Sequence, residues 1–274
     1  MKILQIGCGN MGKVIAQIAA KHFDDITIIT KTQKTTQNQT FEEKNVKCVL
    51  SFDQIAHEKF DVVILAVKPQ NFGEVLQLAK VVAKENTEFF SIMAGVSLEL
   101  LSKALESKNV MRLMPNLGMK EGCGVTLVED KLFSKTQNEI IKRIFQTNGN
   151  IVVKVKEQEI NNLTPLTGSS AALFLQLAQS LITKCGMEKV AGEKVVIEKV
   201  VIENVMEQAL KMLKSQSCNA AIEKIASKGG ITQAMVNAVE NDMQSIATKA
   251  IEAGQERAKS LAAEIENSLK LKIA

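Results

Sequence analysis

The sequence predicts an α/β protein in two parts: a doubly wound, mostly parallel sheet in residues 1–160, followed by an all-helical domain in residues 161–274. Two observations lead to this division. Up to about residue 155, short runs rich in Val and Ile alternate with helix-like stretches, and these runs lack the polar alternation of a half-exposed strand. Such strands are buried on both faces, as in a parallel sheet covered by helices. Beyond residue 160 the strand pattern disappears.

The elements of the first part follow from these runs. The expected strands are residues 3–6, 26–30, 46–50, 61–67, 88–94, 109–115, 124–128 and 150–155, and residues 136–146 have the pattern of a helix. In the second part, residues 169–186 carry apolar side chains at helical spacing, with Gly186 as the expected C-cap. Residues 243–265 keep one apolar face, which predicts another long helix.

Residues 191–213 contain two KVVIE units, whose β-branched residues lower helix propensity. The i,i+4 spacing of Val201, Val205 and Ala209 still favours a helix. Its apolar stripe is broad, and two interpretations stay open: an intramolecular core helix or a subunit interface.

Composition limits the function classes. The net charge is +4, from 34 basic and 30 acidic residues spread without a basic block, so no nucleic-acid partner is expected. No span approaches the ~20 apolar residues of a membrane helix, and Gly7 and Asn10 interrupt the first apolar run, which argues against a signal peptide. We therefore expect a cytoplasmic protein with no membrane partner. Five scattered cysteines and two histidines indicate reduced thiols and no metal site.

A glycine-rich turn follows the first predicted strand. Gly7, Gly9 and Gly12 match the G-x-G-x-x-G spacing of dinucleotide-binding, Rossmann-type domains. Gly7 is expected to make the tight turn, Gly9 to let the backbone approach a pyrophosphate, and Gly12 to let the next helix pack close to the strand. Asn10 and Met11 would begin that helix, whose N–H groups point at the phosphates.

The end of the second strand indicates which dinucleotide binds. An acidic residue at this place usually binds the ribose 2′-hydroxyl of NAD. Here the chain has Thr30, Lys31 and Lys34, which suit a 2′-phosphate, so NADPH is favoured and NADH remains the alternative.

Three further loops are expected at the same edge of the sheet, because ligands lie outside the carboxyl ends of the strands in open α/β sheets. The residues expected there are Ala66 and Val67 at the end of the fourth strand with Lys68 and Pro69 after it, the segment that begins at Met93 at the end of the fifth, and Asn116 after the sixth.

GCGNMG, LAVKPQ, SIMAGVS, RLMPN, GCGVT and SKGGITQA occur in this order along the chain, which in these stretches resembles the pyrroline-5-carboxylate reductases, the enzymes that make proline. The resemblance implies an N-terminal NAD(P)H-binding domain and a helical C-terminal domain that forms a homodimer, or a larger ring of dimers. It also implies that the nicotinamide meets Lys68 and Pro69, Met93, Ala94 and Gly95, and Asn116, and that the substrate is a small cyclic imine.

The SKGGIT stretch has a physical logic of its own. Gly229 and Gly230 allow backbone conformations that point N–H groups at a small carboxylate, and Thr232 can cap the next helix while its hydroxyl faces the substrate. In the resembled family this loop, here Ser227, Gly229, Gly230, Ile231 and Thr232, holds the substrate carboxylate, and its threonine bonds the ring nitrogen. The catalytic candidates are therefore Thr232 and Lys68, with Lys68 as a support of the cofactor or its loop.

The chain departs from the family pattern in three places. Leu117 and Gly118 replace a threonine and a proline, Lys228 replaces a proline, and residues 167–173 read TGSSAAL where the family has S-G-S-G-P-A-Y. Two alternatives to pyrroline-5-carboxylate reduction follow: the same fold acting on another cyclic imine or a hydroxy acid, and a dinucleotide-binding sensor without catalytic activity.

Overall fold

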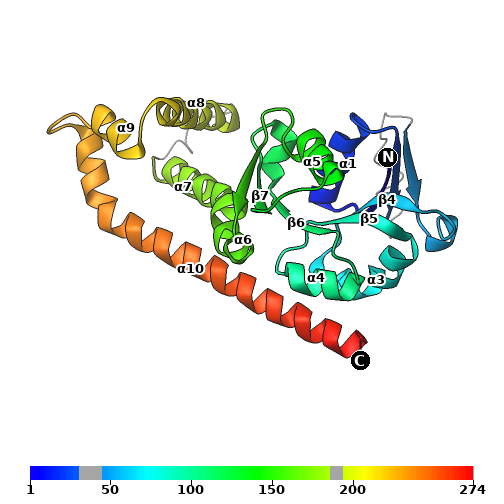
Figure 1. The fold of residues 1–274 in the computed structure, drawn as a ribbon. Coiled ribbons are helices and arrows are strands. Elements are labelled where there is room, and N and C mark those ends of the chain that lie inside the picture. Colours follow the sequence, from blue (N-terminus) through cyan, green and yellow to red (C-terminus); the bar gives the residue numbers. More distant parts are fainter. Residues whose placement is uncertain (31–44, 186–193, 274) are drawn as a thin grey trace. The chain divides into compact units, whose positions relative to one another are not determined.

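The computed structural model describes residues 1–30, 45–185 and 194–273 (Figure 1). The chain forms two compact units: Met1–Gly168 together with Ala253–Ala274, and Ser169–Glu252. The sequence-based division placed residues 161–168 and 253–274 in the helical domain, whereas they cluster with the sheet. Contacts explain this: a Cβ added at Gly254 would lie 2.8 Å from Pro165 Cβ, and Gln255 Nε2 donates to Asn162 O over 3.2 Å.

The first unit is built on an eight-stranded sheet in the order β3-β2-β1-β4-β5-β6-β7-β8. The strands are β1 (Lys2–Ile6), β2 (Asp25–Ile29), β3 (Val46–Val49), β4 (Phe60–Leu65), β5 (Ala83–Ser91), β6 (Val110–Pro115), β7 (Val125–Glu129) and β8 (Ile151–Val155). β1 to β6 are parallel, β7 runs antiparallel to β6, and β8 is parallel to β7. The doubly wound, mostly parallel sheet is confirmed. Its strand order reverses between β1 and β4, which is where such sheets bind ligands.

β4 and β5 differ most from the sequence-based expectation. β4 ends at Leu65, so Ala66 and Val67 lie in the loop that follows. β5 begins at Ala83 because Thr87 supports its polar first half: Thr87 Oγ1 donates to Phe60 O over 2.7 Å and accepts from Lys84 N over 2.8 Å. Apolar patterning does not detect a strand start of this kind.

Helices cover both faces of the sheet (Figure 1). On one face, α1 (Asn10–Ala20) and α5 (Lys135–Ile140), which continues as the π-helical turn η4 (Ile141–Phe145), pack on a core that includes Ile3, Ile28 and Met111. On the other face, α3 (Phe72–Val81) and α4 (Leu98–Leu105) share a core with Ile265 near the end of α10 (Ile231–Ile273). The strands are therefore buried on both faces, as their composition predicts.

The rest of the chain is helical. The 3₁₀ turns of the first unit are η1 (Phe52–Gln54), η2 (Pro69–Asn71) and η3 (Leu117–Glu121), and α6 (Glu157–Thr164) continues into the π-helical turn η5 (Pro165–Ser169). The second unit contains α7 (Ser170–Cys185), α8 (Lys194–Ser215), α9 (Cys218–Ile225) and the first part of α10. The predicted helices 169–186 and 191–213 thus correspond to α7 and α8, whereas Gly186 and residues 191–193 lie outside the described residues. α10 is longer than the predicted 243–265 helix.

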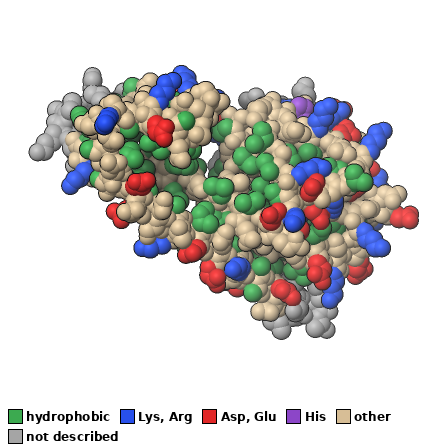
Figure 2. Space-filling model, turned by 60° about the vertical axis from the view of Figure 1, so that its left-hand side comes forward, with side chains coloured by type: hydrophobic (Ala, Val, Ile, Leu, Met, Phe, Trp, Pro, Cys, Tyr) green, Lys and Arg blue, Asp and Glu red, His purple; other side chains and the backbone are tan. Residues whose placement is uncertain are grey.

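The second unit buries little of its own apolar surface. Among its described side chains only Ala178 and Ala221 are buried. Phe174 and Leu175 on α7 are both 62% exposed, and large apolar side chains on α8 and α10 are also exposed. Hydrophobic side chains are visible at the surface in Figure 2. Apolar surface of this extent on one unit is typical of a protein–protein interface.

Within the described residues, the helices lack the combination of length and apolarity needed to cross a bilayer.

Candidate cofactor and substrate sites

The glycine turn lies at the carboxyl end of β1, beside the loop after β4. Gly7 has a φ of +98°, and a Cβ there would lie 2.5 Å from Ala66 O, so only glycine fits. A Cβ at Gly12 would lie 3.0 Å from Gly7 O and 3.3 Å from Ala66 Cβ. The structure thus supports the tight turn expected of Gly7 and the close packing expected of Gly12.

Gly9 differs from the other two, because a Cβ there would meet nothing within 4 Å. Gly9 is also the N-cap of α1, where no side chain caps the helix and the first turn has no acidic residue. The first N–H groups of a helix, here those of Asn10, Met11 and Gly12, have no intrahelical partner and favour an anion. Open space beside an uncapped, carboxylate-free helix start fits a dinucleotide pyrophosphate.

Gln5 is a member of this site that the sequence analysis missed. Its side chain is 1% exposed, and Nε2 donates to Gly7 O over 2.8 Å and to Gly12 O over 2.9 Å. A signal was present in the sequence, because Gln5 is the polar residue within the apolar run Ile3–Ile6.

The end of β2 is only partly described. Thr30 is buried, and its N–H donates to Val49 O over 3.2 Å. Neither Ile29 nor Thr30 supplies a carboxylate for a ribose 2′-hydroxyl. Lys31 and Lys34, the predicted phosphate ligands, lie outside the described residues.

The loop after β4 joins the glycine turn. Ala66 is buried, and its N–H donates to Ile6 O over 2.8 Å. Val67 is half-buried, and Lys68 is exposed just before η2, where its carbonyl accepts from Asn71 N over 2.9 Å.

In the loop after β5, the backbone is better placed than the side chains to contact a ligand. Met93 is 1% exposed and belongs to the core, so its thioether does not face a ligand. Ala94 is half-buried and packs against a small cluster around Met114 and Leu127. Gly95 has a φ of +76°, and a Cβ there would lie 3.2 Å from Ala262 N. The backbone of α10 therefore packs directly against this loop.

Asn116, after β6, has both ends of its side chain bound to the protein. Its Nδ2 donates to Thr167 O over 2.6 Å, and its Oδ1 accepts from Val125 N over 3.1 Å. The side chain therefore holds the loop after β6 to η5 and β7.

An ion pair between the buried Arg112 and the half-buried Glu157 joins β6 to α6, and the sequence analysis also missed it. Arg112 is 1% exposed, and its Nη1 lies 2.8 Å from Glu157 Oε1, while Nη2 donates to Asn161. Burial lowers the pKa of the guanidinium, and the hydrogen bond to Glu157 opposes this shift. These partners are distant in sequence, so no local pattern reveals them.

The second unit carries the predicted substrate loop between α9 and α10. Gly229 has a φ of +73°, as a glycine turn requires, but its N–H donates to Gln233 Oε1 over 2.7 Å. The N–H of Gly230 donates to Ser227 O over 2.9 Å. The expectation that these two N–H groups point at a carboxylate is therefore wrong for this structure, because acceptors within the loop hold both.

The expected capping role of Thr232 is also corrected. α10 begins at Ile231, and Gly230 O accepts from Ala234 N over 3.2 Å, so Gly230 occupies the cap position and Thr232 is the second helical residue. The N–H groups of Ile231 and Thr232 belong to the first turn, where an anion is favoured. Two hydroxyl-bearing residues are close to these N–H groups along the chain: Thr232 itself and Ser227, which is exposed.

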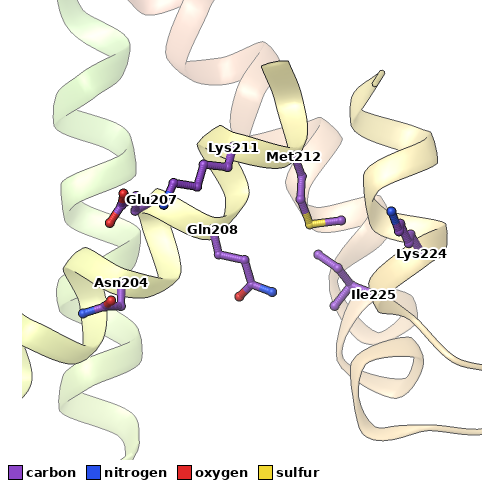
Figure 3. A pocket seen from close by; sticks show the side chains of 7 residues that line it. All are labelled: Asn204, Glu207, Gln208, Lys211, Met212, Lys224 and Ile225. Atoms are coloured by element: carbon purple, nitrogen blue, oxygen red, sulfur yellow. Dashed lines mark ion pairs between the residues drawn. The ribbon is translucent and has the colours of Figure 1, made fainter. Parts of the chain in front are cut away.

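A hollow of about 620 Å³ lies between α8 and α9 (Figure 3). Its lining is mixed, with Met212 and Ile225 beside Gln208, and Glu207 and Lys211 pair with each other over 2.8 Å. The hollow is part of the exposed surface of the second unit, and we assign no role in substrate binding or catalysis to its lining residues.

Comparison with known proteins agrees with this arrangement. The model "NADP oxidoreductase coenzyme F420-dependent" matches residues 2–95, and the model "Pyrroline-5-carboxylate reductase dimerisation" matches residues 157–261. The pyrroline-5-carboxylate reductase of Staphylococcus haemolyticus is 28% identical over 97% of this chain and 100% of its own length. That of Aquifex aeolicus is 28% identical over 85% of this chain and 86% of its own.

Solved structures show the same fold. Plasmodium falciparum pyrroline carboxylate reductase, solved with NADP bound, superposes with a TM-score of 0.79 at 22% identity, covering 96% of this chain and 98% of its own. The Coxiella burnetii pyrroline-5-carboxylate reductase gives 0.77 at 25% identity, over 95% and 98%. The dimerisation model at the C-terminal end and the relatives along the whole length agree: this chain is similar to the pyrroline-5-carboxylate reductases over nearly all of its residues.

Proposed function

We propose that this protein reduces pyrroline-5-carboxylate to proline with NADPH. The observation that carries the proposal is the glycine turn: Gly7 and Gly12 are required by backbone packing, whereas Gly9 faces open space at an uncapped helix start. Relatives named for this reaction align with almost the whole chain, and the match to the dimerisation model spans the loop after α9.

The bound cofactor would supply a hydride to the C=N carbon. The N–H groups at the start of α1 would hold its pyrophosphate, and Thr30, Lys31 and Lys34 the ribose 2′-phosphate. Lys68 and Pro69, the backbone at Met93, Ala94 and Gly95, and the loop held by Asn116 would border the nicotinamide.

The chain's own groups would orient the imine. The hydroxyl of Thr232 would hydrogen-bond the ring nitrogen, and the first-turn N–H groups of Ile231 and Thr232, with the hydroxyl of Ser227, would hold the carboxylate. Gly229 and Gly230 would give the loop its backbone shape. Their N–H groups would not bind the carboxylate, because they donate to Gln233 Oε1 and Ser227 O. A cyclic imine can arrive protonated or take its proton from water, so no acidic side chain is required.

The protein would act in the cytoplasm as a homodimer, or as a larger ring of dimers. Support comes from the match to the dimerisation model and from the exposed apolar side chains of α7 and α8. The division into a dinucleotide-binding domain, residues 1–160, and a helical domain, residues 161–274, stays part of the proposal, with the last turns of α10 packed on the first unit.

The test is NADPH consumption with pyrroline-5-carboxylate, with NADH in parallel and proline identified as the product. We expect turnover with a preference for NADPH. Binding of NADPH without turnover on any of a panel of cyclic imines would contradict the enzymatic proposal and favour a sensor. Faster turnover of another cyclic imine would contradict only the proposal that pyrroline-5-carboxylate is the substrate.

A further inference from the structure

We propose that Gln5 is a positioning residue that holds the glycine turn in its pyrophosphate-binding shape; this inference rests on the proposed function. Gln5 lies in β1 on the face that α1 covers, since Ile3, two residues earlier, packs in the core shared with α1. A polar side chain in such a place is costly to bury, so its contacts require an explanation.

The two hydrogens of one amide nitrogen bridge both ends of the turn. Nε2 donates to Gly7 O, at the beginning of the turn, over 2.8 Å and to Gly12 O, in the first turn of α1, over 2.9 Å. The side chain thus fixes the distance between the end of β1 and the start of the helix that would receive the phosphates.

The bond to Gly7 O also sets the direction of a peptide. In a trans peptide the N–H points opposite to the C=O, so holding Gly7 O toward the core turns the N–H of Cys8 away from it. The orientation of the Gln5 amide is itself determined, because a flipped amide would put Oε1 against two carbonyl oxygens. Oε1 is buried and has no hydrogen-bond partner among the described residues, so the two donor contacts are the ones that explain the residue.

Loss of the two Gln5 hydrogen bonds should weaken cofactor binding without unfolding the protein. Replacing Gln5 by methionine keeps the length of the side chain and removes both donors. The turn then becomes free to rearrange, and the pyrophosphate has to order it on binding. Adenosine 2′-monophosphate lacks the pyrophosphate that the turn would hold, so its affinity should not change in this variant.

The experiment compares Gln5→Met with wild type and with Thr27→Val, a control that removes a buried polar group from the neighbouring strand β2. We expect Gln5→Met to bind NADPH about tenfold more weakly, adenosine 2′-monophosphate as wild type does, and to keep its melting temperature within a few degrees. Thr27→Val should bind both probes normally.

Unchanged NADPH affinity in Gln5→Met would overturn the inference, as would an equal loss for both probes, which would indicate general loosening. If Gln5→Met does not fold, Gln5→Asn replaces it: its amide is too short to reach both carbonyls, and it should show a smaller loss confined to NADPH. A wild-type chain that binds neither NADPH nor NADH would overturn the proposed function instead.

Discussion

The buried Arg112 and the half-buried Glu157 form an ion pair in which Nη1 and Oε1 lie 2.8 Å apart. The same carboxylate oxygen accepts from the N–H of Leu98, the first residue of α4, over 3.3 Å. One side chain of α6 thereby holds β6 and the start of α4, and α4 follows directly on the loop Met93–Gly95. The pair stabilises the support of the proposed nicotinamide site.

Glu157→Ala should destabilise the protein by about 3 kcal/mol, because it leaves a buried guanidinium without its counter-charge. Urea unfolding at fixed protein concentration measures this change. The control is Glu139→Gln, which removes the exposed pair with Arg143 and should cost less than about 1 kcal/mol. Equal effects of the two substitutions would show that burial adds nothing to the Arg112 pair.

Cys8, inside the glycine turn, should be a poor nucleophile. Burial and, to a lesser extent, the neighbouring Cys48 raise the pKa of its thiol from 9.0 to about 11. At pH 8 the thiolate fraction is then about a hundredfold lower than for an ordinary thiol, and iodoacetamide should alkylate Cys8 far more slowly than the exposed Cys218. Peptide mass spectrometry over time gives both rates, and comparable rates would contradict the raised pKa.

The same shift predicts how stability depends on pH. Between pH 9 and 11 the unfolded thiol loses its proton while the folded one keeps it, so the unfolded state binds fewer protons. The contribution of Cys8 to the free energy of unfolding is therefore complete below pH 9 and is lost as the pH rises toward 11. Cys8→Ala should flatten this decline, and an unchanged slope would exclude Cys8 as its source.

The parts of the site that sequence could predict are those set by local geometry. The spacing of Gly7, Gly9 and Gly12 carries the turn, and the apolar runs place each strand to within a few residues. The ion pair of Arg112 escaped because its partner is brought close by tertiary packing: Arg112 and Glu157 are 45 residues apart in sequence. The partners of Gln5, Gly7 and Gly12, are near in sequence, but its bonds to their carbonyls depend on the conformation of the turn. Gln233 escaped for a different reason: its side chain reaches back to the N–H of Gly229, in the loop before α10, and the sequence does not show that this N–H needs an acceptor.

Cofactor preference should depend on the residues after β2. Replacing Lys31 and Lys34 together by alanine should narrow the preference for NADPH over NADH by about tenfold or more, because charge-assisted bonds to a phosphate contribute about 1.5–3 kcal/mol. The ratio of kcat/KM for the two cofactors measures it. A ratio equal to that of wild type would show that these lysines do not bind the 2′-phosphate.

Thr232→Ala should lower kcat/KM for the imine by about tenfold to a hundredfold, the effect of one oriented hydrogen bond, and leave NADPH affinity near wild type. Since Gly230 rather than Thr232 occupies the cap position of α10, the melting temperature should hardly change. A matching loss of NADPH affinity or of thermal stability would assign Thr232 to folding instead of substrate orientation.

The last prediction concerns which subunit supplies Thr232 to a given cofactor. We expect the substrate loop of one subunit to complete the site of its partner, because the helical unit exposes the apolar surface that a dimer would bury. Two impaired variants test this, one with Thr232→Ala and one with the glycine turn blocked.

Gly9→Asp is the better block, because a Cβ at Gly9 meets nothing within 4 Å, whereas one at Gly12 lies 3.0 Å from Gly7 O. Aspartate is also a favourable N-cap, so its carboxylate should bind the first N–H groups of α1 and exclude the pyrophosphate without unfolding the turn. NADPH binding by the Thr232→Ala variant and its absence in Gly9→Asp confirm that each change acts as intended.

The two variants are then unfolded, mixed in equal amounts and refolded, with different tags to quantify the hybrids. If sites are shared in a two-fold dimer, each hybrid carries one site with both defects and one intact site, so about a quarter of all sites regain activity after random mixing. If each subunit holds a complete site of its own, every site in a hybrid keeps one defect and none recovers. Hybrids with no more activity than the two separate variants would therefore place Thr232 in the same subunit as the cofactor it serves.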